Sequence, residues 1–340
     1  MNGMETFEAL AGNPHIKDYF SRAFAGEKIP HALLLTGEAG SGKTMVARAF
    51  AARLQCEHPQ GLSACGMCRS CKQMAGGNHP DVITVEHEKP RSFGVEDIRG
   101  GLVNDMTIRP YASRYKVYLL DLGDLTITPE AQNAMLKTLE EPPSYGVLVI
   151  MTRNAEALLD TIRSRCVQLG MQPVPDETVR AMLAGKITTG ADEDVIVSLA
   201  RGNVGRALKL AASEDVAEVI AETLAALKNI RRMRADEIQA FTAGLKEKRD
   251  AVPEAFSIAR FWYRDCLCLK ADENAPIVLE KERRAIAAEA AERPAAELAG
   301  VFDAIGEAEA RLAGNVTFEV AMEVLLMAMR GRGERTLWQK

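Results

Sequence analysis

The chain has 340 residues, of which 47% are apolar, 26% charged and only 5% aromatic, so it is neither disordered nor of low complexity and can form two or three domains with buried cores. Its 42 Lys and Arg against 47 Asp and Glu give a net charge of −5, which excludes a general coat for nucleic-acid phosphates; contact with nucleic acid would need a local patch or a larger assembly. No apolar run approaches the ~18 residues of a membrane span, and the amino-terminal residues do not form a secretory signal, so we expect a cytoplasmic protein without a membrane contact.

The first 170 residues alternate between short apolar runs and helical patterns. The runs are rich in Val, Ile, Leu or Tyr, which is typical of buried strands in a parallel sheet. They are Leu33–Gly37, Val82–Glu86, Lys116–Asp121, Gly146–Thr152 and Cys166–Leu169. Helical patterns lie between them at Thr44–Leu54, Val95–Met106 and Ala131–Glu140. This alternation predicts an α/β fold with a doubly wound parallel sheet.

The pattern changes after Pro173 and Pro175. Residues 176–212 have the pattern of short helices separated by glycines. Residues 213–330 are rich in Ala, Leu, Glu, Arg and Lys and contain few prolines, which predicts a second region made of helices.

A phosphate-binding motif follows the first predicted strand. The segment from Gly37 to Thr44 fits Gly-x-x-x-x-Gly-Lys-Thr and precedes a helical pattern. Glycines let successive backbone N–H groups converge on phosphate oxygens, and the helix N-terminus adds a favourable dipole. Lys43 would reach the β- and γ-phosphates, and the Thr44 hydroxyl would ligate Mg²⁺. The motif therefore predicts a site for ATP or ADP with Mg²⁺. Its candidate residues are Gly37, Gly40, Ser41, Gly42, Lys43 and Thr44.

A carboxylate that could hold Mg²⁺ ends the third predicted strand, at Asp121. A hydrolysing enzyme of this type normally has a second carboxylate beside it to orient the attacking water. Here the next residue is Leu122, whose side chain cannot act as a base. Asp124 is an alternative base. The sequence therefore predicts nucleotide binding with weak or absent hydrolysis.

Four cysteines lie close together in the spacing C-x8-C-x2-C-x2-C, and they are Cys56, Cys65, Cys68 and Cys71. Four thiolates can surround one tetrahedral Zn²⁺ at ~2.3 Å each, whereas disulfides are rare in the cytosol. We therefore predict a structural zinc module, inserted between the helix after the phosphate loop and the next strand. His58 is an alternative to Cys56 as the fourth ligand.

Further motifs follow in order along the chain. They are Asn-His-Pro-Asp at 78–81, Asp-Ile-Arg at 97–99, the segment ending Leu-Lys-Thr-Leu-Glu-Glu-Pro-Pro at 131–143, and Ser-Arg-Cys at 164–166. With the phosphate loop and the cysteines, this ordered set resembles the bacterial DNA polymerase III clamp-loader subunits of the AAA+ superfamily. The resemblance covers essentially the whole chain.

Within that family two subunit types compete. The gamma/tau type is a hydrolysing ATPase with an Asp-Glu pair where this chain has Asp121 and Leu122. The delta-prime type is shorter and often degenerate at its nucleotide site. The Leu122 position favours delta-prime, although the intact phosphate loop leaves ATP binding open. A gamma/tau-type ATPase and a zinc-containing AAA+ adaptor or helicase-like protein outside replication are the alternatives.

The resemblance also implies roles for three residues. Arg165 of Ser-Arg-Cys corresponds to an arginine finger that would reach the nucleotide site of a neighbouring gamma/tau subunit. Thr152 matches the residue called sensor 1, and Arg206 matches sensor 2 over the γ-phosphate. The implied partners are gamma/tau and delta subunits in a hetero-oligomer, the sliding clamp, and primer–template DNA contacted through the complex.

The resemblance finally implies three domains. Residues 1–172 would form the AAA+ nucleotide-binding core, with the zinc module at about 56–71. Residues 173–214 would form a small helical lid, and residues 215–340 an all-α collar that holds the oligomer together.

Overall fold

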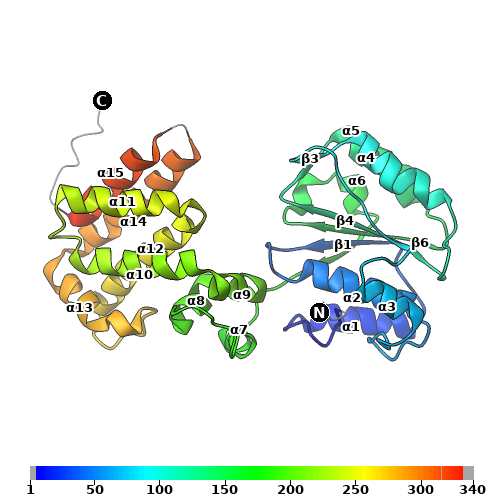
Figure 1. Cartoon of the computed structure of the whole chain (residues 1–340), viewed down its shortest axis with the longest axis horizontal. Helices are drawn as coiled ribbons and strands as arrows, with labels where there is room; N and C mark the ends of the chain where they lie inside the picture. Colours follow the sequence, from blue (N-terminus) through cyan, green and yellow to red (C-terminus); the bar gives the residue numbers. More distant parts are fainter. Residues whose placement is uncertain (1–4, 315, 332–340) are drawn as a thin grey trace. The chain divides into compact units, whose positions relative to one another are not determined.

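The chain folds into two compact units, described here for residues 5–314 and 316–331 of a computed structural model (Figure 1). The first unit ends at Met182 but also includes Gly202–Arg206. The second unit consists of Leu183–Arg201 and the chain from Ala207 onward. Within the described residues, no helix combines the length and apolar character needed to span a bilayer.

A five-stranded parallel sheet, in the order β2-β4-β6-β1-β7, forms the centre of the first unit. Its strands are β1 (Ala32–Thr36), β2 (Val82–Thr84), β4 (Lys116–Gly123), β6 (Gly146–Thr152) and β7 (Val167–Gly170). Each overlaps one of the predicted strands. The register sets Thr36 beside both Thr152 and Gly170, so the carboxyl ends of three strands meet at one edge. That edge is the usual place for a ligand in an open α/β sheet.

Helices cover both faces of this sheet, which confirms the predicted doubly wound architecture. Figure 1 shows α1 (Pro14–Ala25), α2 (Lys43–Gln55) and α3 (Arg69–Ala75) on one side. On the other side lie α4 (Val95–Ile98), α5 (Pro129–Glu140) and α6 (Asp160–Arg163). A separate pair of short strands, β3 (Ser92–Phe93) and β5 (Thr126–Ile127), lies outside the main sheet.

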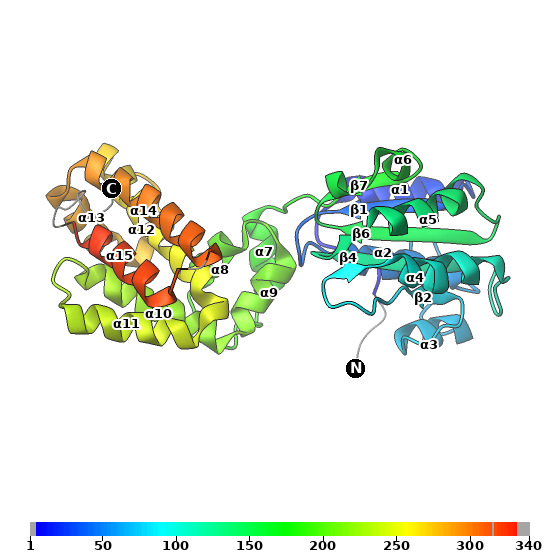
Figure 2. The same cartoon turned by 90° about the horizontal axis from the view of Figure 1, so that it is seen from above.

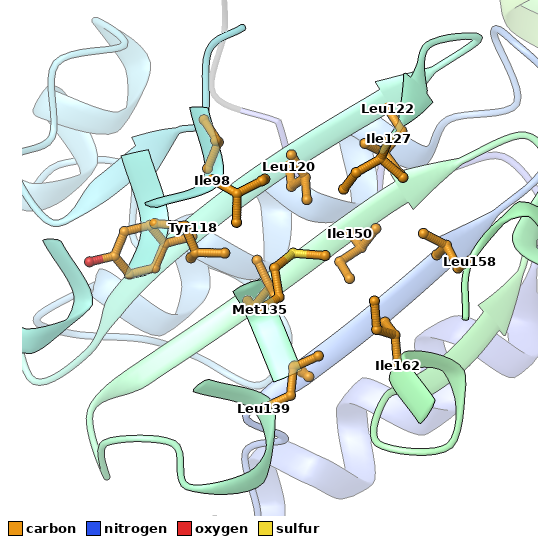
Figure 3. Close-up of a cluster of buried hydrophobic side chains, with 14 of the residues drawn as sticks. Ile98, Tyr118, Leu120, Leu122, Ile127, Met135, Leu139, Ile150, Leu158 and Ile162 are labelled. Carbon is orange, nitrogen blue, oxygen red and sulfur yellow. The ribbon is translucent and has the colours of Figure 1, made fainter. Parts of the chain in front are cut away.

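Strand β4 shows how one sequence serves both faces. Because side chains alternate along a strand, Val117 and Leu119 are buried with the helices of one face. Tyr118 and Leu120 are buried on the other face, in the cluster that Figure 3 draws. A strand buried on both faces is apolar throughout, as the sequence predicted for this run.

The helix predicted over Val95–Met106 differs in the structure. Only Val95–Ile98 is α-helical; Arg99–Asn104 forms a wide π-helical turn and Asp105–Thr107 a 3₁₀ turn. The predicted pattern is thus helical throughout, but in three different geometries. The wide turn contains Gly101, where an added Cβ would lie only 3.2 Å from the side chain of Val85. Gly101 therefore packs closely against Val85, the residue that follows β2.

Beyond the sheet, the described chain contains only helices. They are α7 (Asp176–Leu183), α8 (Glu193–Ala200), α9 (Val204–Ala212), α10 (Glu214–Asn229), α11 (Ala235–Glu247), α12 (Val252–Ala271), α13 (Arg283–Glu292), α14 (Ala295–Ala313) and α15 (Phe318–Arg330), with short 3₁₀ turns between some of them. Helix α12 is central, because it packs against α10, α13 and α14 (Figure 2). Its Trp262 and Tyr263 side chains are fully buried.

A buried ionic cluster ties several of these helices together. The Arg293 side chain is 1% exposed and pairs with Glu289 at 2.8 Å and Glu297 at 2.9 Å. Its Nη1 atom also donates to the Met329 carbonyl at 2.9 Å, near the end of α15. The indole N–H of Trp262 donates to Glu289 Oε2 at 2.6 Å. A buried charge of this kind is tolerated because it is paired with two carboxylates and donates several hydrogen bonds.

Candidate nucleotide site and candidate metal centre

The phosphate loop connects the end of β1 to the start of α2. Gly42 has φ of 101° and directly precedes the first helical residue, Lys43. Gly37 has φ of 147°, and a Cβ there would lie 2.8 Å from the Met171 Cβ. Glycine is therefore required at both positions, one for the turn and one for close packing. The Ser41 Oγ atom is buried and has no hydrogen-bond partner within the described residues, which leaves it available to a ligand.

Lys43 folds back over its own loop. Its Nζ donates to the Gly37 carbonyl at 2.7 Å and to the Glu38 carbonyl at 3.0 Å. Burial lowers the pKa of Lys43, while the nearby carboxylates, Asp121 first among them, act in the opposite direction. The Lys43 ammonium thus donates to two carbonyl oxygens of its own loop. In a complex with a nucleotide, phosphate oxygens would take the place of these carbonyl oxygens as its hydrogen-bond partners.

Asp121 lies next to the hydroxyl of the phosphate-loop threonine. Thr44 Oγ1 donates to Asp121 Oδ2 at 3.4 Å, and Asp121 Oδ1 accepts the backbone N–H of Gly123 at 3.0 Å. An irregularity in the β4–β6 pairing between Asp121 and Gly123 allows this local contact. A hydroxyl and a carboxylate together are the hard oxygen ligands that Mg²⁺ prefers, so these two residues fit a magnesium ion.

Leu122 points away from this oxygen-rich site. Its side chain is 2% exposed and belongs to the buried apolar cluster that Figure 3 shows, with Leu120 and Ile127. The side chain of Asp124, the alternative base, is engaged by the guanidinium of Arg153. In this arrangement neither residue supplies a free carboxylate beside Asp121.

Thr152 ends β6 at the same edge of the sheet. Its carbonyl accepts the backbone N–H of Gly37 at 3.3 Å, so it borders the phosphate loop directly. Its hydroxyl exchanges hydrogen bonds with the backbone of Asn154, at 3.1 and 3.2 Å. The backbone of Thr152 thus lies next to the phosphate loop, whereas its side chain points toward the turn that Thr152 forms with Asn154.

Residues just before Arg206 also contact the loop. Asn203 Nδ2 donates to the Ala39 carbonyl at 2.8 Å, and the Gly205 N–H donates to the Gly40 carbonyl at 3.2 Å. A Cβ on Gly205 would lie 2.3 Å from that carbonyl oxygen, so no larger residue fits. The Arg206 N–H donates to Asn203 Oδ1 at 3.0 Å. The sequence analysis identified Arg206 as a candidate residue of the nucleotide site but missed Asn203. The only feature of the sequence that could have indicated Asn203 is the pair of glycines on either side of it.

Arg165 lies at the surface, just beyond α6. Its Nη2 atom pairs with Glu140 Oε1 at 2.8 Å, and its Nη1 atom donates to the Thr161 carbonyl at 2.8 Å. About a third of its side chain is exposed. Both partners belong to α5 and α6 and not to the phosphate loop, so Arg165 is placed separately from the residues that would hold a nucleotide.

The four predicted cysteines converge in space. The Sγ atoms of Cys56, Cys65, Cys68 and Cys71 all lie within 4.8 Å of one another. Around a tetrahedral Zn²⁺ with bonds of about 2.3 Å, sulfur atoms lie about 3.8 Å apart. The distance between Cys65 Sγ and Cys71 Sγ is 3.9 Å. Within the described residues, the set contains Cys56 and not His58.

Backbone geometry prepares these thiols for a metal ion. The N–H groups of Cys65, Cys68 and Cys71 each point at a cysteine sulfur, at 3.2 to 3.4 Å. Such hydrogen bonds stabilise thiolates, and those from the N–H groups of Met67 and Cys68 lower the pKa of Cys65 to about 6. The donor set therefore fits a closed structural Zn²⁺ site with four sulfur ligands and no open position.

The metal centre is linked to the sheet through His79 and Asp81. The ring of buried His79 lies 3.3 Å from Ser70 Oγ, on the same short helix as Cys71, and its Nδ1 accepts the Asp81 N–H at 3.2 Å. The buried Asp81 carboxylate accepts the backbone N–H groups of Tyr111, Ala112 and Ser113 at 2.6 to 2.9 Å. The Asn-His-Pro-Asp motif thus fixes the loop before β4 and the helix that carries the cysteines.

The amino-terminal region is similar to known subunits of DNA polymerase III. Residues 12–175 match the family described as DNA polymerase III, delta subunit. The tau/gamma subunit of Haemophilus influenzae DNA polymerase III is 33% identical over 204 residues, 59% of this chain. The gamma subunit of Buchnera aphidicola is 32% identical over 61% of this chain. These matches show a similarity to subunits of DNA polymerase III over the amino-terminal region.

The relatives are longer than the matched region. The chain spans 29% of the length of the Haemophilus protein and 57% of that of the Buchnera protein. A solved gamma subunit-related protein of Thermotoga maritima aligns over 93% of this chain and 99% of its own, with a TM-score of 0.46 and 20% identity. At that level the structural likeness adds nothing to the assignment.

Proposed function

We propose that this chain is a delta-prime-type subunit of the DNA polymerase III clamp loader, which binds Mg²⁺–ATP with little or no hydrolysis of its own. The observation that carries this proposal is the burial of Leu122 in the core, where a hydrolysing enzyme of the family would present a carboxylate. Without a base beside Asp121, water next to the γ-phosphate would not be activated. The nucleotide would then serve to order the subunit.

Nucleotide binding would use the residues at the sheet edge. The Lys43 ammonium, now on two backbone carbonyls of its loop, would turn to phosphate oxygens. Thr44 and Asp121 would hold Mg²⁺, which screens the phosphate charge when bound. The backbone N–H groups of Gly40, Ser41 and Gly42 would complete the cradle, because α2 begins directly after them.

Arg165 would act on a neighbouring gamma/tau subunit. A planar guanidinium suits the charge that develops on the γ-phosphate during transfer. The ion pair with Glu140 supports this role, since it orients a partly exposed arginine without burying it. Thr152 and Arg206 would take the sensor positions of this subunit's own site.

The rest of the proposal concerns architecture and partners. Residues 1–172 would be the AAA+ core with its zinc module, residues 173–214 the lid, and residues 215–340 the collar. Through the collar the chain would assemble with gamma/tau and delta subunits. The complex would load the sliding clamp onto primed DNA in the cytoplasm.

A hydrolysing gamma/tau-type ATPase is the second candidate. The intact phosphate loop favours it, as do the names of the relatives that match the amino-terminal region. The two candidates differ in one measurable property, which is ATP turnover by the isolated chain.

The deciding experiment measures ATP hydrolysis by the purified chain, with and without primed DNA. We expect turnover no greater than that of Lys43→Ala, which lacks the phosphate-binding ammonium. Turnover that is vigorous and vanishes in Lys43→Ala would contradict the delta-prime proposal. We expect Leu122→Glu to create little activity alone, because a finger from another subunit would still be absent.

A further inference from the structure

Arg153 joins two acidic side chains at the phosphate loop. Its Nη2 atom lies 2.7 Å from Glu38 Oε2, within the loop itself. Its Nη1 atom lies 2.5 Å from Asp124 Oδ1, just after β4. The guanidinium therefore bridges the loop that would hold phosphates and the strand end that would hold Mg²⁺. The proposed function assigns Arg153 no role.

The backbone fixes Arg153 at this position. It directly follows Thr152, whose carbonyl accepts the N–H of Gly37. The Arg153 N–H donates to the Gly123 carbonyl at 3.4 Å, on the neighbouring strand β4. Backbone hydrogen bonds at Thr152 and at Arg153 itself thus fix the main chain at the sheet edge. The Arg153 side chain can still exchange its carboxylate partners for another acceptor.

The charges around Lys43 confirm that Arg153 belongs to the same site. Besides burial, the groups that act on the pKa of Lys43 are Asp121, Arg153, Glu38 and Asp124. The site thus contains two cationic and three carboxylate side chains. Arg153 is already neutralised there by its two acidic neighbours.

The two ion pairs are easy to exchange. The side chains of Arg153, Glu38 and Asp124 are 38%, 72% and 70% exposed. Ion pairs this exposed contribute little net free energy. Two oxygens of a phosphate group can accept from the same planar guanidinium, and the group carries more negative charge than either carboxylate.

We propose that Arg153 lets the site distinguish a nucleoside triphosphate from a diphosphate, by exchanging Glu38 and Asp124 for oxygens of the terminal phosphate. The inference rests on the nucleotide binding proposed above. The lysine of this loop type reaches the β- and γ-phosphates. Arg153 reaches the same loop from the carboxyl end of the adjacent strand, on the side of Asp121 and Asp124, where the last phosphate would meet Mg²⁺. A diphosphate would leave the arginine on its two carboxylates.

The test is calorimetric titration of the full-length chain with Mg²⁺ and either ADP or the slowly hydrolysed analogue ATPγS. In Arg153→Ala we expect the affinity for ATPγS to fall about tenfold, as for one lost charge-assisted contact, and the affinity for ADP to stay within about twofold. Arg153→Lys should recover part of the lost affinity for ATPγS, because lysine keeps the positive charge but cannot make the two parallel hydrogen bonds of a guanidinium. An equal fall for both nucleotides in Arg153→Ala would overturn the proposal.

Two further variants separate this idea from nucleotide binding itself. Lys43→Ala should lose both nucleotides, and Arg99→Ala, which removes an exposed arginine paired with Glu96, should lose neither. Glu38→Gln combined with Asp124→Asn releases the guanidinium and should increase the preference for ATPγS; a decreased preference would count against the exchange. If the unaltered chain bound neither nucleotide, the proposed function would fail together with this inference.

Discussion

His79 shows how one buried side chain can connect a metal centre to a sheet. Its Nδ1 atom accepts the Asp81 N–H, so the ring must be neutral at that nitrogen. Its Nε2 atom faces the hydroxyls of Ser70 and Ser113. Protonation of Nδ1 would place its hydrogen against the Asp81 N–H group and break the hydrogen bond between Asp81 and His79. Burial accordingly lowers the pKa of His79, against the opposing charge of Asp81.

The first prediction follows from this lowered pKa. An unfolded chain, in which His79 titrates near 6.5, binds more protons than the folded chain as the pH falls, so stability is full above about pH 6.5 and declines below it. His79→Asn keeps an acceptor near the Asp81 N–H but does not titrate. Urea unfolding at pH 7.5 and 5.5 should show a smaller loss of stability for this variant than for the unaltered chain.

A matched control for that experiment is His31→Asn. His31 is exposed and precedes β1, so its removal should leave the pH dependence unchanged. Equal slopes for all three proteins would mean that His79 does not carry the effect.

At the scale of elements, the cysteine module is the part whose folding we expect to depend on a metal ion. It lies between α2 and β2, and its ligands come from the end of α2, a loop and the short helix α3. Seven residues of helix are too few to be stable alone, so α3 depends on its attachments. Metal binding would therefore be coupled to the folding of this segment.

We expect purified protein to contain about one zinc ion per chain. Cys65→Ser with Cys68→Ser should lose the metal and lower the melting temperature, and a strong chelator should do the same to the unaltered chain. Cys268→Ser, which changes a thiol outside the set, should keep the zinc. Elemental analysis and thermal unfolding measure both properties. A metal-free chain of unchanged stability would contradict the assignment.

We expect the stability of the helical unit to depend on the buried ion pair between Arg293 and Glu289. Arg293→Met would leave the Glu289 carboxylate, which is 7% exposed, without its cation. Loss of one member of a buried pair costs about 3–5 kcal/mol, against about 0–1 kcal/mol for an exposed pair. We expect urea unfolding to show that loss for Arg293→Met and almost none for Arg234→Ala, whose pair with Asp236 is exposed. Similar values for the two variants would show that the buried cluster is dispensable.

At the scale of the whole molecule, sequence patterns predicted what depends on local spacing. The five strands of the main sheet, the phosphate loop and the four cysteines were found this way, whereas the short strands β3 and β5 were not. The pairing of Arg153 with Glu38 was not, because 115 residues separate them. The contact of Asn203 with Ala39 spans 164 residues. The change from α- to π- and 3₁₀-helical geometry within the pattern Val95–Met106 was also not predicted.

A last prediction concerns assembly. If Arg165 serves a neighbouring subunit, Arg165→Ala should leave assembly with gamma/tau and delta subunits near normal but reduce ATP turnover by the complex at least about tenfold. Arg163→Ala is the matched control, since Arg163 pairs with Asp160 within the same helix. Gel filtration and a steady-state ATPase assay provide the readouts. Unchanged turnover would refute the trans role.

The five residues Gly202–Arg206 belong to the first unit, although the residues before and after them in the sequence belong to the second unit. Because Gly205 has no room above the Gly40 oxygen, a ligand that lifts this oxygen must displace these five residues too. The phosphate loop therefore contacts a segment that continues along the chain, at both of its ends, into residues of the second unit.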